Sequence, residues 1–411
     1  MDNKIIAIIV VAVLVIAGVG VFIALGNNGG NDGASGLSIV GRVNSEGSGI
    51  ILKPGEDATE YITETLEKPG LGAKYIKNES TGIYYVFNTS KWGGQVFATP
   101  GAATIQHVQL STLASTMGLK YASYTDGMSR SDDTLYYVAG VASFAEFENK
   151  IASSPLVGYI IWEAQYSVGL EKDYVGLALT NDLFEGHTCC IIGASNNYLK
   201  NNEETVVTFL SVYLQAVNRI DAALLDPTSD DFEKLIKIAK NRVAMPDGLT
   251  DEEKEEVIMS ALYNVTYIYA DDDLGSLTKL KADIASLAES LYNTKQITNS
   301  ASDLGFKSYT ELADKFVDDT YMKKAVKVDD AKLANSTTIT VAAINGDIHQ
   351  IALWFAKDTG MFSAANLNVD VSGQSNGPGV YTVLANGEAN MGFLGAPPMT
   401  IRCMNAEDIH A

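Results

Sequence analysis

Short polar stretches at the ends of predicted strands hold most of the side chains that could do chemistry in this sequence. Three of these stretches contain a histidine, namely His107, His187 and His349, and Glu163 follows another apolar run. Imidazole and carboxylate groups, together with nearby cysteine thiolates, are ligands that transition metals accept. The spacing, however, offers no local pair of metal ligands. We therefore expect these histidines to be hydrogen-bonded residues, and we expect no metal, no other cofactor and no catalytic residue.

Two further stretches, TPGAATIQH and GQSNGPGV, read as tight turns that open a helix. The free backbone N–H groups and the partial positive charge at a helix start favour an anion. Gly101, Ala102 and Thr104 stand at the first helix start, and Ser375 and Asn376 stand at the second. Few lysines or arginines accompany them, so helix dipoles and neutral donors would hold a ligand. The same residue types also make ordinary turns and caps, and that interpretation stays open for each of them.

Strands that alternate with helices must position these stretches. The runs LSIVGRVNSEGSGIIL, LVGYIIW and HTCCIIGAS predict strands, the first of them broken at NSEGS. Residues 203–327 favour helices, with capping boxes at Thr250 and Ser308. From Ile339 the sequence predicts strand, helix, strand, helix, strand, which is half of an open sheet. This alternation predicts a parallel or mixed α/β sheet.

The charge balance limits the partners of the protein. It has 29 basic and 50 acidic residues among 411, a formal charge of −21. This excess argues against a nucleic acid or an anionic membrane surface as the partner. The three cysteines, Cys189, Cys190 and Cys403, cannot form a disulfide scaffold, and we expect them to be buried small residues.

An unbroken apolar run from Ile5 to Leu25 has the length of a membrane-spanning helix. Lys4 precedes it, so residues 1–4 should stay in the cytoplasm and the chain after the run should lie outside. Residues 26–36 are a polar, glycine-rich tether. We expect an uncleaved membrane anchor, with a cleaved signal segment as the alternative.

Several segments resemble one family of extracytoplasmic receptors. AKDTGMFSAANLNVDV, VLANGEANMGFLGAPP and the helix DIHQIALW resemble the first lobe of solute-binding proteins of the nitrate/taurine/sulfonate group of ABC importers. VGYIIWEAQYS and HTCC resemble later strands of that family. Asn390, Ala164 and Thr188 depart from it, because the family usually has Asp, Pro and Pro there. The resemblance implies an α/β, two-lobe, periplasmic-binding-protein-like (type II) fold, which would follow the N-terminal transmembrane helix that the apolar run predicts.

The order of these segments differs from that of the family. The first three strands of the family are missing before residue 337, and residues 337–411 supply them. We expect a circular permutation, with a truncated tandem copy as the alternative, and a monomer, with a strand-swapped dimer as the alternative. The expected parts are lobe one at 37–95 and 337–411, lobe two at 96–200, and helices with a linker at 201–336.

The resemblance implies a non-enzymatic receptor that closes two lobes around a small, anionic solute and delivers it to an ABC permease and its ATPase. Nitrate, a sulfonate, bicarbonate and a pyrimidine stay open as the solute. The alternatives are a thiamine-pyrimidine-related or metal-dependent enzyme, or a sensor that never docks to a permease. The predicted contact residues lie at carboxyl ends of strands. They are Asn345, Asp347, His349, Ser375, Asn376, Ala396, Asn44, Glu46 and Ser48 in lobe one, and Gly101, Ala102, Thr104, His107, Trp162, Glu163 and His187 in lobe two.

Overall fold

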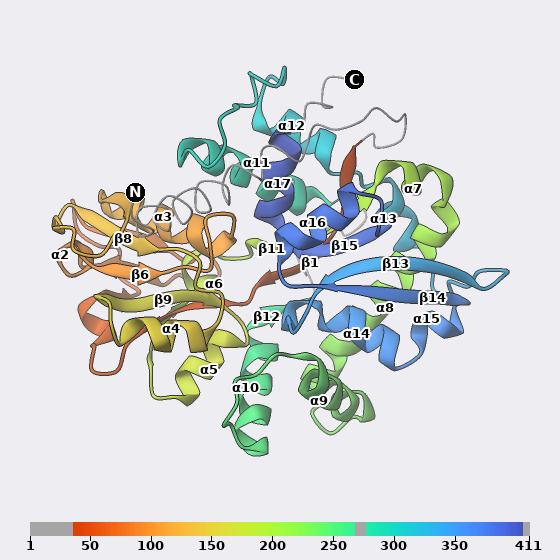
Figure 1. The fold of residues 1–411 in the computed structure, drawn as a ribbon, viewed down its shortest axis with the longest axis horizontal. Helices are drawn as coiled ribbons and strands as arrows, with labels where there is room; N and C mark the ends of the chain where they lie inside the picture. The colour runs from red at the N-terminus through yellow and green to blue at the C-terminus, as the bar shows by residue number, and fades with distance from the viewer. Residues whose placement is uncertain (1–35, 268–276, 406–411) are drawn as a thin grey trace, which may run out of the picture. The chain divides into compact units, whose positions relative to one another are not determined.

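The computed structural model describes residues 36–267 and 277–405, whose strands form two six-stranded sheets and a three-stranded one (Figure 1). Sheet A has the strand order β12-β1-β11-β15-β13-β14. Its strands are β1 (Leu37–Glu46), β11 (Thr188–Ser195), β12 (Val265–Thr266), β13 (Thr337–Ile344), β14 (Leu367–Gln374) and β15 (Met391–Gly395). The predicted membrane segment at residues 5–25 falls outside the described ranges. Within those ranges, no helix combines the length and apolar character that crossing a membrane requires.

Sheet B has the strand order β10-β2-β9-β6-β8-β7. Its strands are β2 (Ser48–Leu52), β6 (Val96–Ala98), β7 (Lys120–Ser123), β8 (Thr134–Val138), β9 (Leu156–Trp162) and β10 (Val175–Leu179). The small third sheet joins β3 (Ile62–Thr65), β5 (Tyr84–Phe87) and β4 (Lys74–Lys77). Both large sheets mix parallel and antiparallel pairs, as the sequence predicts.

Helices occupy most of the remaining described residues. In the first half they are α2 (Thr89–Trp92), α3 (Ile105–Met117), α4 (Phe144–Ile151), α5 (Gln165–Glu171), α6 (Thr180–Leu183), α7 (Asn196–Asn201), α8 (Glu203–Leu225), α9 (Asp230–Arg242) and α10 (Asp251–Tyr263). In the second half they are α11 (Thr278–Asn293), α12 (Tyr309–Phe316), α13 (Thr320–Ala325), α14 (Ile351–Asp358), α15 (Met361–Ala364), α16 (Gly377–Ala385) and α17 (Ala396–Asn405). Two short 3-10 turns are η1 (Ala58–Glu60) and η2 (Ile348–Gln350).

Helix starts follow the predicted capping chemistry closely. The capping box at Thr250 is confirmed, because its hydroxyl accepts from the backbone N–H of Glu253 and the Glu253 carboxylate accepts from the N–H of Thr250. At Ser308 the box forms only in part. The Ser308 hydroxyl caps Glu311, but the Glu311 carboxylate accepts from the N–H of Lys307 instead.

The end of the chain completes the sheet that its beginning starts. Strand β15 pairs antiparallel with β11, which pairs antiparallel with β1, and β13 pairs parallel with both β14 and β15. In Figure 1 the blue strands β13, β14 and β15 therefore belong to the same sheet as the red β1. The segment from Ile339 onward is part of sheet A and does not begin a separate sheet.

Two segments cross between the sheets, and they move the boundaries of the expected lobes. Strand β1 of sheet A continues through Gly47 into β2 of sheet B, and the α6 segment returns from β10 of sheet B to β11 of sheet A. The ranges 37–95 and 96–200 therefore do not follow the sheets. The polar NSEGS stretch is also no loop, because Glu46 and Gly47 turn the backbone at φ values of 65° and 79° while the strand stays buried.

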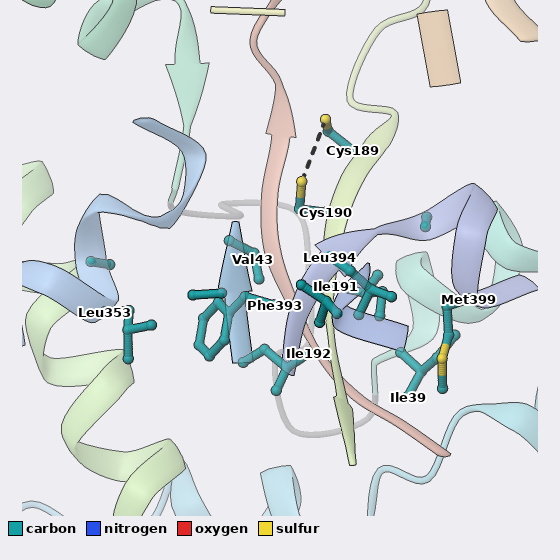
Figure 2. Close-up of a cluster of buried hydrophobic side chains, with 14 of the residues drawn as sticks. Ile39, Val43, Cys189, Cys190, Ile191, Ile192, Leu353, Phe393, Leu394 and Met399 are labelled. Atoms are coloured by element: carbon teal, nitrogen blue, oxygen red, sulfur yellow. Dashed lines mark hydrogen bonds between the residues drawn. The ribbon is translucent and has the colours of Figure 1, made fainter. Parts of the chain in front are cut away.

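Both faces of sheet A are buried, which explains its apolar strands. On one face Val43, Ile192 and Phe393 point toward Leu353 of α14, and on the other Leu394 points toward Met399 of α17 (Figure 2). This two-sided burial is typical of strands that read as continuous apolar runs. The three cysteines are free and buried, as expected, with the sulfurs of the adjacent pair 3.8 Å apart.

Candidate functional site

A cavity of about 180 Å³ lies between helices that belong to different sheets. Its walls are α3, which covers sheet B, the segment that joins α6 to β11, and α11 with the first residue of α17. The polar lining residues are Gln109, Thr112, His187, Thr188, Asp283, Ser286 and Ser290. Of the predicted contact residues, His187 and Ala396 line this cavity.

Helix α3 carries consecutive polar side chains that are buried on all its faces. The side chain of Gln106 donates from Nε2 to the hydroxyl of Ser48 at 2.8 Å. Gln109, only 3% exposed, has no hydrogen-bond partner for Nε2 or Oε1 among the described residues. Buried amides are nearly always hydrogen-bonded, and an unpartnered one costs about 1–3 kcal/mol. Gln109 lines the cavity, and a polar molecule that reached its amide would satisfy it.

His107 lies in the first turn of α3, and it is not among the residues that line the cavity. Its Nδ1 lies 3.3 Å from the hydroxyls of Thr99 and Tyr121, and its ring makes an edge contact with Tyr137. Burial lowers the pKa of His107 to about 4, so the ring is neutral at pH 7. The structure thus gives this histidine an internal, packed position.

The ring of His187 has one satisfied and one unsatisfied nitrogen. Nδ1 lies 2.7 Å from the carbonyl oxygen of Phe184. Because a carbonyl can only accept, Nδ1 carries the proton. Burial lowers the pKa of His187 to about 4, so at pH 7 the ring is neutral and Nε2 offers a lone pair. Nε2 is buried in the cavity wall and has no partner among the described residues.

Backbone contacts hold His187 in this position. The carboxylate of Glu46 accepts from the N–H of Gly186 at 3.0 Å, and the N–H of Glu46 donates to the carbonyl of His187 at 3.1 Å. Oε2 of Glu46 accepts from the hydroxyl of Thr266 at 2.9 Å. Burial raises the pKa of Glu46, with these hydrogen bonds acting against the shift. The predicted contact residue Glu46 is therefore a support of the cavity wall.

Asp283 is the acidic residue of the cavity, and protein groups already engage both its oxygens. Oδ2 accepts from the N–H of Thr188 at 3.0 Å and from its hydroxyl at 2.7 Å. Oδ1 lies 2.8 Å from Nζ of Lys279, and a guanidinium nitrogen of Arg42 lies 3.9 Å from Oδ2. The carboxylate charge is thus balanced locally, and Asp283 fixes the start of β11 beside His187.

Asp347 and His349 meet the crossing strand at Gly47. Nδ1 of His349 lies 2.6 Å from Oδ1 of Asp347, and Nε2 lies 2.9 Å from the carbonyl oxygen of Gly47. Burial disfavours a charged ring, but the Asp347 carboxylate raises the pKa of His349 to about 10. His349 is therefore protonated at pH 7 and donates from both nitrogens. These two predicted contact residues join η2 to the crossing between the sheets.

Glu163, directly after β9, is a second buried acid with a full set of partners. It accepts from Nδ2 of Asn264 at 2.7 Å, and from the N–H and the hydroxyl of Ser167 at 3.2 Å and 3.0 Å. Burial raises its pKa. Since Asn264 ends α10 and Ser167 lies in α5, Glu163 connects a sheet B helix to the helical region that follows β11.

The structure places the remaining predicted residues in two groups. Asn44 and Ser48 are buried inside the strands on either side of the crossing, not in a loop as the sequence suggests, because β1 runs through to Glu46. The others lie near the surface: Asn345, Ser375, Asn376 and Ala102 are exposed, and Gly101, Thr104 and Trp162 are half-buried. Thr104 caps α3, and Asn376 caps α16.

Gln109 and the α11 residues are cavity-lining positions that sequence reasoning missed. The stretch TPGAATIQH predicts a turn that opens this helix, and the prediction assigns its polar residues to that turn alone. A usable signal was present in TIQHVQLST, where polar residues fall on every face of a helix that the fold must bury. For α11 no comparable signal exists, since Asp283 and Ser290 lie in an ordinary amphipathic pattern.

In residues 36–267 and 277–405, no three histidine, cysteine, aspartate or glutamate side chains gather as a metal site would require. No family model and no curated protein matches the sequence. Two solved structures are similar. One is the ligand-binding component of an ABC-type import system from Staphylococcus aureus with zinc bound, at 14% identity over 71% of this chain and 75% of that chain, with a TM-score of 0.42.

The other is the periplasmic nitrate-binding protein NrtA from Synechocystis PCC 6803. It is 13% identical, the match covers 71% of this chain and 68% of that chain, and the TM-score is 0.39. Likenesses of this size assign neither a ligand nor a partner to this chain, and the geometry of the cavity has to supply the argument.

Proposed function

We propose that this protein is an extracytoplasmic solute-binding protein that captures a small polar solute for an ABC importer. The observation that carries the proposal is the cavity between α3 and α11, because two of its lining residues, Gln109 and His187, have buried polar side-chain atoms without partners among the described residues. A concave site with a few converging polar groups is the usual form of a small-molecule site. The segment resemblance to importer receptors agrees with this role.

The two crossing segments supply a mechanism for capture. Sheets A and B are joined at Gly47 and again through α6, and the cavity lies between helices from the two sides. Rotation at a few residues of two such connections would open and close the cavity, as in hinge-closing receptors. The lobe surfaces would then dock to the permease, whose ATPase drives uptake.

Ligand-induced stabilisation tests the proposal directly. Purified protein is heated with nitrate, sulfonates, bicarbonate or pyrimidines, and the melting temperature is recorded. A solute at a hundred times its Kd adds about 2.7 kcal/mol to the unfolding free energy. We expect a shift for at least one solute, and we expect Gln109→Leu to abolish it.

Gln215→Leu is the matched control, because Gln215 is a glutamine on α8 whose amide already bonds Ser211 and the Asp329 carbonyl. It should retain the shift of the wild type, whatever it costs in stability. If the folded wild type responds to none of these solutes, the proposed function is wrong.

We propose further that residues 5–25 anchor the protein to the membrane with the described part outside, and that it acts as a monomer. The placement of β13 to β15 in sheet A agrees with one chain that completes its own sheet. Fractionation of cells tests the anchor, and light scattering of the part after residue 26 tests the monomer. A dimer that dissociates only on unfolding would instead favour strand swapping.

A further inference from the structure

The cavity also limits which kind of solute can bind, if the proposed function holds. We propose that the solute carries an N–H or O–H group that donates to Nε2 of His187, while its other polar atoms bond the amide of Gln109. Molecules that can only accept hydrogen bonds, such as nitrate and simple alkylsulfonates, are thereby disfavoured. The inference rests on the geometry of these two side chains.

The acceptor character of Nε2 follows from the other ring nitrogen. Nδ1 of His187 lies 2.7 Å from the carbonyl oxygen of Phe184, so Nδ1 must be the protonated nitrogen. The contacts that Gly186 and the His187 carbonyl make with Glu46 hold the backbone of this loop in place. Burial lowers the pKa of His187 to about 4, so at pH 7 the ring is neutral and Nε2 carries the lone pair. Nε2 is buried, has no partner among the described residues, and belongs to a residue that lines the cavity.

Gln109 complements this acceptor with groups of both kinds. Both amide atoms lack partners among the described residues, so the side chain can donate from Nε2 and accept at Oε1. By contrast, Gln106 on the same helix is tied to Ser48. The cavity thus presents one fixed acceptor and one amide that adapts to the ligand.

The cavity offers little to balance a full negative charge. None of the described residues that line it is a lysine or an arginine, and the oxygens of Asp283 already serve Thr188 and Lys279. An acceptor-only anion would place its oxygens against the lone pair of His187 and leave Nε2 unsatisfied. Leaving a buried polar group unpaired costs about 1–3 kcal/mol, which is roughly a tenfold loss of affinity or more.

Pairs of solutes that differ by one donor test the inference. Bicarbonate and nitrate are planar monoanions of similar size, and only bicarbonate has an O–H. Isethionate and ethanesulfonate are alkylsulfonates that likewise differ by one hydroxyl. By calorimetric titration at pH 7, we expect the donor-bearing member of each pair to bind roughly tenfold more tightly or better. Any pyrimidine that binds is compared in the same way with its N-methylated analogue.

Two variants of His187 test whether the solute preference depends on the acceptor at Nε2 or only on the structural role of the ring. In His187→Asn the amide nitrogen can still donate to the Phe184 carbonyl, but nothing replaces Nε2, so the preference between pair members should disappear. In His187→Gln an amide oxygen can take the place of Nε2, and part of the preference should return. Nitrogen NMR of His187 in the wild type should show an unprotonated Nε2, which does not depend on any variant folding.

The outcomes distinguish a failure of this inference from a failure of the proposed function. If an acceptor-only member binds as tightly as its donor-bearing partner, or if Nε2 carries the proton at pH 7, this inference fails while the proposed function stands. If no solute of the wider screen binds folded protein, the proposed function itself fails. Equal loss of both pair members in His187→Asn would also overturn the inference, because it would indicate a merely structural ring.

Discussion

Replacement of Gly47 by alanine tests whether the crossing between the sheets depends on the contact with His349. A Cβ at this position would lie 2.5 Å from Nε2 of His349 and 2.7 Å from Cγ2 of Val265. The residue also has φ of +79°, where a side chain costs about 1–2 kcal/mol. Displacement of the His349 ring would break a charged hydrogen bond worth about 1.5–3 kcal/mol. We therefore expect Gly47→Ala to lower the unfolding free energy by about 2.5–5 kcal/mol.

Gly55→Ala is the matched control for this prediction. Gly55 has φ of +89°, but a Cβ there would meet no atom within 4 Å. It should therefore show only the backbone cost of about 1–2 kcal/mol. The assay is urea unfolding followed by fluorescence, with linear extrapolation for both variants. Equal losses would refute the reasoning, because they would mean that the His349 ring yields without cost. In a His349→Ala background, the additional loss from Gly47→Ala should shrink.

Four further predictions concern the buried histidines, the buried acid Glu163 and the order of the chain. The pKa of His349 is raised to about 10, so its contribution to the unfolding free energy is complete below pH 6.5. This contribution declines as the pH rises toward 10, by up to about 1.4 kcal/mol per pH unit. Urea unfolding at several pH values should show the decline in the wild type but not in Asp347→Asn. The lowered pKa values of His107 and His187, both about 4, act in the opposite direction, so stability should also fall as the pH drops from 6.5 to 4. Glu163→Gln gives the buried side chain an N–H donor in place of a carboxylate oxygen that accepts from the Asn264 amide, and it should cost about 1–3 kcal/mol in urea unfolding. Replacement of the exposed Glu146 on α4 by glutamine should cost less, and similar costs would argue against a structural role for Glu163. If the chain order is a circular permutation, as the order of the segments predicts, moving residues 337–405 ahead of residue 37 through a flexible linker should give a folded protein with the same solute preference. A variant that only aggregates would count against it.

Much of the fold could be predicted from periodicity, because its strands are continuous apolar runs. Leu156–Trp162 forms the strand that LVGYIIW predicts, and the strands from Ile339 onward appear in the predicted order with small changes at their ends. These runs are readable because sheet burial on two faces removes polar residues from the strand. The prediction of a break at the polar NSEGS stretch was wrong for the opposite reason.

Glu46 and Ser48 in this stretch are polar and yet buried, because partners far away in sequence form hydrogen bonds with them. Glu46 bonds Gly186 and Thr266, and Ser48 bonds Gln106, contacts that no local pattern announces. The same applies to the cavity. His187 could be named from its place after a predicted strand, whereas Gln109 becomes notable only once its missing partners are seen. Local residue types locate strand ends, but only tertiary contacts decide which polar groups stay available.

The pairing of β15 with β11 has a consequence for how the protein is made. Strand β11 and its neighbour β1 leave the ribosome long before β13, β14 and β15, yet the later strands cover one whole side of the β11 edge. Until they arrive, the apolar edge that runs from Cys190 to Ala194 has no partner strand. Unpaired apolar edges invite aggregation, and pairings between distant parts of a chain form slowly. Sheet A can therefore close only after synthesis has passed residue 395, and until then the nascent chain carries an unpaired β11 edge.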